Sequence, residues 1–123
     1  MQKKIPNDEL VLKISSAAYS FKELGHYSSK EKAIKALLKR KGFEGYSLQK
    51  LTSQFEQALK VISDAGEFVE EELPQKTLVY MEQEEVDRFI NTLRETLKDK
   101  NPHVPQEMIR FALNWIYTNY YLR

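Results

Sequence analysis

Apolar residues recur at alternating steps of three and four between Leu48 and Val69. This spacing of about 3.5 residues places their side chains along one face of a helix for nearly three heptads. The series consists of Leu48, Leu51, Phe55, Ala58, Ile62, Ala65 and Val69. Other apolar residues widen the stripe, so we expect the helix to contact more than one neighbour. It must end by Leu73, because Pro74 disfavours the helical conformation at the residue before it.

The same kind of spacing predicts four other helices, over about residues 8–24, 28–41, 82–98 and 105–122. Residues 74–81 break the pattern, and whether residues 77–80 form a strand stays open, because a single short strand has no obvious partner. A chain of 123 residues, 41% of them hydrophobic, can bury one hydrophobic core. We therefore expect a single all-α domain over residues 1–123, a compact bundle of about five helices with the apolar C-terminal helix packed centrally.

Residues that cap helices mark several of the predicted ends. Ser28 fits as the N-cap of the second helix, and Glu31, three residues later, completes a capping box. Ser47 fits as the N-cap of the third helix, after a turn at residues 42–46. Gly25 suits the left-handed conformation at the end of the first helix, which glycine adopts without steric cost.

The C-terminal stretch has no charged residue between Arg110 and Arg123. Its predicted helix is apolar or aromatic around most of its circumference, and such a helix is buried centrally or beneath a partner. Its narrow polar strip consists of Glu107, Arg110, Asn114 and Thr118. Protein interfaces are enriched in aromatic residues and depleted in lysine and glutamate. We therefore predict a partner-binding surface formed by Phe111, Tyr117, Tyr120 and Tyr121.

The residue inventory excludes several kinds of catalytic site. The chain has no cysteine, so it has no disulfide, thiol nucleophile or cysteine-ligated metal. The two histidines, His26 and His103, fall in predicted turns, and neither has a second ligand spaced to share its helix face. The four glycines do not form a phosphate-binding loop. We therefore expect no catalytic residue set, no metal and no cofactor.

The charges divide unevenly along the chain. Residues 1–62 hold 12 Lys or Arg and 6 Asp or Glu, whereas residues 63–123 hold 7 and 12. We favour attraction between the two halves as the reason for this split. An alternative is nucleic-acid binding through the second helix, where Lys32, Lys35 and Lys39 cluster opposite the apolar face and could neutralise phosphates.

Two pairs of carboxylates provide a third interpretation. Glu67 and Glu70 are three residues apart near the end of one predicted helix, and Glu84 and Asp87 are three apart near the start of the next. This spacing resembles the ExxE…ExxD pattern of the all-α, MazG-like nucleoside triphosphate pyrophosphohydrolases. The resemblance covers these four positions, and it implies that the four acids bind Mg²⁺ and that the protein cleaves between the α- and β-phosphates.

Taken together, these features favour a small helical protein that acts by binding another protein, with a homodimer as the expected form. No apolar run approaches the roughly 20 residues that a membrane-spanning helix needs. The basic N-terminus is followed by the polar residues 7–9, where a signal peptide would become apolar. We therefore expect a cytoplasmic protein without a membrane partner.

Overall fold

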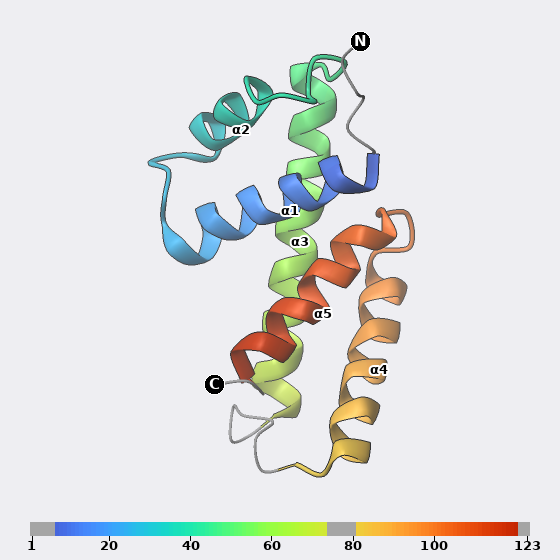
Figure 1. The fold of residues 1–123 in the computed structure, drawn as a ribbon. Coiled ribbons are helices and arrows are strands. Elements are labelled where there is room, and N and C mark those ends of the chain that lie inside the picture. Colours follow the sequence, from blue (N-terminus) through green and yellow to red (C-terminus); the bar gives the residue numbers. More distant parts are fainter. Residues whose placement is uncertain (1–6, 74–80, 121–123) are drawn as a thin grey trace. The chain divides into compact units, whose positions relative to one another are not determined.

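The computed structural model describes residues 7–73 and 81–120, and it contains five α-helices (Figure 1). The helices are α1 (Asn7–Leu24), α2 (Lys30–Leu38), α3 (Leu48–Glu72), α4 (Gln83–Lys100) and α5 (Gln106–Tyr120). The described residues contain no strand, which confirms the predicted all-α architecture. The segment for which a strand was considered, residues 77–80, lies outside the described residues, as does Tyr121.

Contacts between Cα atoms divide the chain into two compact units, Met1–Lys60 and Val61–Arg123. The boundary falls within α3, so the first part of this helix belongs to one unit and the rest to the other. Helices α1 and α2 pack together in the first unit, and α4 and α5 pack together in the second. The expectation of a single domain over the whole chain remains a prediction.

The helix ends follow local capping chemistry, with one correction to the sequence prediction. The N-cap of α2 is Ser29 rather than Ser28: its Oγ accepts a hydrogen bond from the Lys32 backbone N–H at 3.2 Å. Adjacent serines offer the same chemistry, and this choice leaves Glu31 in the first turn, where it pairs with Lys35 at 3.1 Å. Ser47 does cap α3, since its Oγ accepts from the backbone N–H three residues later at 3.0 Å.

The core of the first unit is formed by apolar faces of α1, α2 and the start of α3. Its buried hydrophobic residues are Leu10, Val11, Ile14, Ala17, Ala18, Ala33, Ile34, Leu37, Phe43, Leu51, Phe55 and Ala58. Phe21 of α1 lies 6.2 Å from Phe55 of α3, measured between ring centroids. At the surface, Lys30 Nζ of α2 lies 2.7 Å from Glu56 Oε1 of α3. Both contacts connect α3 with the two shorter helices of this unit.

The second unit is built around the facing apolar sides of α3, α4 and α5. Its buried hydrophobic residues are Val61, Ile62, Ala65, Val69, Leu73, Val86, Leu93, Leu97, Met108, Ile109, Ala112, Leu113 and Ile116. The end of α4 is held by Asn101, a buried residue whose Nδ2 donates to Asp64 Oδ2 at 3.1 Å and to the Leu97 carbonyl at 3.0 Å. This amide therefore ties the C-terminus of α4 to α3.

Leu48 departs from the predicted apolar seam. Its side chain is 48% exposed, whereas Leu51 and Phe55 on the same face are fully buried. Leu48 is the first residue of α3, one turn before the covered part of the helix begins. A repeat in the sequence therefore identifies the apolar face of α3 but not the residue at which its burial starts.

Candidate functional site

The predicted partner-binding surface lies on α5, which has three distinct sides. One side is buried and holds the residues that form the core of the second unit. A second side is an exposed strip of Arg110, Asn114 and Thr118, as the sequence predicted, whereas Glu107 is half-buried. Half-buried residues, most of them aromatic, lie between the buried side and the exposed strip.

The aromatic residues do not form one continuous patch. At about 100° per residue, Phe111 lies on one flank of the exposed strip and Tyr117 lies on the other. Tyr120 lies further round the helix, towards the buried side. All three side chains are half-buried and take part in interactions within the chain. Residues 111–120 carry no formal charge, so this surface is polar at its centre, aromatic on both flanks and uncharged beyond Arg110.

The basic residues predicted for nucleic-acid binding are gathered on one exposed side of α2. Lys32, Lys35 and Lys39 are all exposed; Lys39 is the C-cap residue of α2, and Arg40 and Lys41 extend the cationic run beyond it. Lys35 is partly neutralised by Glu31, which lies on the same helix. The structure therefore confirms that α2 presents a lysine face, with part of its charge already balanced.

A contact that the sequence did not reveal lies where the turn after α2 meets the start of α3. Lys50 Nζ, on the first turn of α3, sits 4.5 Å from the centroid of the Tyr46 ring. Phe43 contacts the same ring edge-on, and burial raises the pKa of the Tyr46 hydroxyl. An aromatic residue four positions before a lysine is the signal that could have identified this pair. It fixes one cation at the start of α3 rather than leaving it free for a ligand.

The turn between α2 and α3 also positions an acidic side chain. Glu44 Oε2 accepts a hydrogen bond from the Gly42 backbone N–H at 2.9 Å. Hydrogen bonds from its own backbone N–H and from that of Gly42 lower the pKa of the Glu44 carboxyl group. Gly42 has a φ of 103°, a conformation that residues with a Cβ rarely adopt. The turn thus places one fixed carboxylate next to the basic run of α2.

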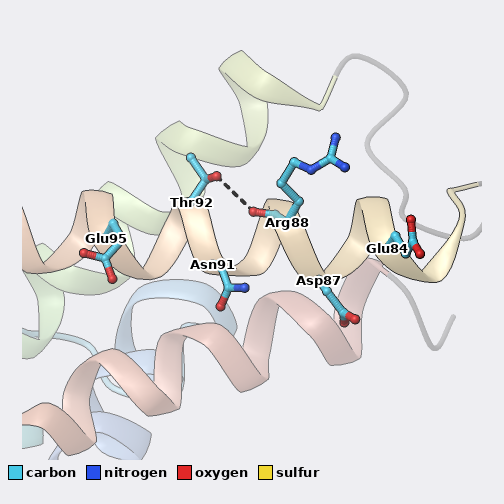
Figure 2. A pocket seen from close by; sticks show the side chains of 6 residues that line it. All are labelled: Glu84, Asp87, Arg88, Asn91, Thr92 and Glu95. Carbon is cyan, nitrogen blue, oxygen red and sulfur yellow. Dashed lines mark hydrogen bonds between the residues drawn. The ribbon is translucent and has the colours of Figure 1, made fainter.

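The acidic pair of α4 lies at an open surface pocket (Figure 2). Glu84, Asp87, Arg88, Asn91, Thr92 and Glu95 line this pocket, so every lining residue comes from one helix. Figure 2 shows Asp87 and Asn91 pointing to one side of α4, and Arg88 and Thr92 pointing to the other. Asp87 Oδ1 accepts a hydrogen bond from Gln83 Nε2 at 2.9 Å.

The second acidic pair is not part of this pocket. Glu67 and Glu70 are exposed on α3, and neither lines the pocket on α4. Within residues 7–73 and 81–120, no three Asp, Glu or His side chains approach closely enough to hold one metal ion. The structure therefore does not gather the four carboxylates into one group of metal ligands, and the site that the ExxE…ExxD resemblance implies stays a prediction.

A few large apolar side chains are exposed in the first unit, and the sequence did not single them out. They are Leu12, Leu24, Tyr27 and Leu48. The most exposed is Leu24, at 52%, which ends α1 just before Gly25 adopts a φ of 63°. That positive φ confirms the left-handed conformation predicted for this glycine.

Comparison with protein-family models, with curated protein sequences and with solved structures gave no match. In the part of the chain that the structure describes, no helix is both long enough and apolar enough to cross a membrane. The fold thus defines the protein as an all-α protein of five described helices.

Proposed function

We propose that this chain is a non-catalytic, cytoplasmic helical protein that acts by binding another protein through the outer side of α5. The expected partner is a second copy of the chain. The observation that carries the proposal is the exposed Arg110–Asn114–Thr118 strip with half-buried aromatic rings on both flanks. A partner that covers the strip would also cover the remaining exposed parts of Phe111 and Tyr117.

The composition of this side supports protein binding more than solvation. Interface cores are enriched in tyrosine, phenylalanine and arginine, and they are depleted in lysine, glutamate and aspartate. From Arg110 to Tyr120, α5 contains the enriched types and no lysine, glutamate or aspartate. A solvated helix side of similar length usually carries several charges, as the outer side of α4 does with Glu84, Arg88 and Glu95.

Light scattering on the full chain tests self-association. We expect a mass near twice 14.5 kDa at high concentration. Asn114→Glu should return the mass to that of one chain, because it places a charge at the centre of the surface without disturbing a buried side chain. Asn91→Glu is the matched control, since it makes the same change at an exposed site on α4 and should leave the dimer intact. A wild-type monomer at high concentration would show that self-association is wrong.

Nucleic-acid binding through α2 remains the second candidate, and one observation favours it. Lys32, Lys39, Arg40 and Lys41 are exposed, and none forms an ion pair with another described residue. We expect only weak, non-specific association at physiological salt in a mobility-shift assay. A sub-micromolar complex that weakens steeply with salt, and that disappears when Lys32, Lys35 and Lys39 are all changed to Glu, would reverse this ranking.

A further inference from the structure

A groove between α4 and α5 gathers three cations in the acid-rich second unit. It is lined by Arg94 and Lys98 from α4 and by Gln106, Ile109, Arg110 and Leu113 from α5. The groove has a volume of about 290 Å³, and no carboxylate is among these lining residues. Ile109 and Leu113 are buried and give the groove an apolar floor, whereas Lys98 and Arg110 are exposed and Arg94 is half-buried at its walls.

The local geometry explains how these residues meet. Arg94 and Lys98 are one turn apart on α4, and Gln106 and Arg110 are one turn apart on α5. Since α5 runs back alongside α4 after a short turn, the last turns of α4 lie beside the first turns of α5 (Figure 1). The Arg94 guanidinium also donates a hydrogen bond to Asn91 Oδ1, which holds it along the helix.

Helix electrostatics account for only part of this arrangement. Lys98 lies in the last turn of α4, where the negative end of the helix dipole favours a cation. Arg110 lies near the start of α5, where the dipole gives it no such support. Like charges one turn apart also repel, as Arg94 and Lys98 do. Among the residues that the structure describes, none of these three cations has an ion-pair partner. An anion in the groove would relieve this repulsion.

The donor set indicates the chemical class of that anion. Two guanidinium forks, one ammonium group and one amide offer more donors than the two oxygens of a carboxylate can accept. A phosphate group has three terminal oxygens and about two negative charges, and arginine binds such groups in a bidentate manner. The apolar floor formed by Ile109 and Leu113 favours a phosphate attached to a small apolar body.

We propose that the groove between α4 and α5 binds a small phosphate monoester, with Arg94, Lys98 and Arg110 holding the phosphate and Ile109 and Leu113 contacting its organic part. This proposal does not rest on the partner-binding function, and Arg110 belongs to both surfaces. Arg94 and Lys98 lie outside the α5 strip, so variants at these two positions test the groove alone.

Titration of phenyl phosphate into the full chain, followed by calorimetry and by the Ile109 methyl resonance, tests the site. We expect saturable binding of phenyl phosphate that is tighter than binding of inorganic phosphate, which lacks the ring, and of benzoate, which lacks the third oxygen. Arg94→Gln and Lys98→Gln should each weaken binding about tenfold, the change expected for loss of one charge-assisted hydrogen bond.

Arg88→Gln is the matched control, because it removes a charge from α4 at a position outside the groove. It should leave the affinity for phenyl phosphate unchanged. If Arg88→Gln weakened phenyl phosphate binding as much as Arg94→Gln does, the binding would reflect general attraction to positive charge and not a defined site. Absence of saturation, or an Ile109 resonance that does not move in the wild-type protein, would overturn the proposal even if a variant fails to fold.

Discussion

A buried hydroxyl group on α1, that of Ser15, should lower the free energy of unfolding. Ser15 is 1% exposed, and its Oγ has no hydrogen-bond partner among the described residues. An unsatisfied buried polar group costs about 1–3 kcal/mol, so Ser15→Ala should raise the free energy of unfolding by about 1 kcal/mol. Urea denaturation measures this change. Ser16→Ala, at the exposed neighbouring position, should change stability by less than about 0.5 kcal/mol. A loss of stability in Ser15→Ala would show that the hydroxyl is satisfied in solution.

At the scale of single residues, the sequence predicted which kind of residue caps a helix or faces its core. It did not predict the exact position at which this happens. The sequence correctly placed a capping serine at the start of α2, but two adjacent serines satisfy the same rule, and the structure uses Ser29. It also marked Leu48 as part of an apolar face, although this residue lies before the covered part of α3. Local rules do not contain the information about which turn of a helix its neighbours cover.

At the scale of helices, two glycines should respond in opposite directions to the same substitution. Gly66 lies inside α3, and a Cβ there would meet Trp115 Cη2 at 3.9 Å, which is ordinary van der Waals contact. Gly66→Ala should therefore raise the free energy of unfolding by about 1 kcal/mol, because alanine loses less backbone entropy in a helix. Gly25→Ala should lower it by about 1 kcal/mol, since the φ of 63° strains any residue with a Cβ. Thermal unfolding of both variants checks the contrast, and a destabilised Gly66→Ala would contradict it.

The acidic pairs of α3 and α4 provide a second prediction at this scale. No described group of three carboxylates can share an ion, so we expect no release of pyrophosphate from nucleoside triphosphates with Mg²⁺ or Mn²⁺. A coupled pyrophosphate assay measures this. Turnover that is lost in both Glu67→Gln and Asp87→Asn would show that the pairs come together in solution and would restore the hydrolase interpretation. The spacing alone could not decide, since it specifies the helix face of each pair but not the angle between the helices.

The helices could be predicted from the sequence alone, whereas the candidate binding surfaces depend on how the helices pack. Helical periodicity predicted all five helices, because each apolar face extends over several turns. It also predicted the polar strip of α5, and the same periodicity separates Phe111 from Tyr117, but only the structure shows that Glu107 of this strip is half-buried. The α4–α5 groove was not predicted at all, because Arg94 and Arg110 come together only when the two helices pack side by side.

For the whole molecule, α3 is the reason to expect one cooperative unfolding transition. This helix continues from Leu48 to Glu72 across the boundary between the two compact units. If one unit unfolded alone, α3 would have to end at the boundary, and the backbone groups at the new helix end in the other unit would lose their intrahelical partners. We therefore expect Ile14→Val, a buried change in the first unit, to shift the transition reported by Trp115, the chain's single tryptophan, in the second unit. The shift should correspond to about 1 kcal/mol and should match that of Ile116→Val, which lies in the second unit itself.

Urea unfolding followed by Trp115 fluorescence and by far-ultraviolet circular dichroism measures the transition in the second unit and in the whole chain. A Trp115 transition that is unchanged in Ile14→Val would show two independently folding units, because an energetic change in one unit then would not reach the other.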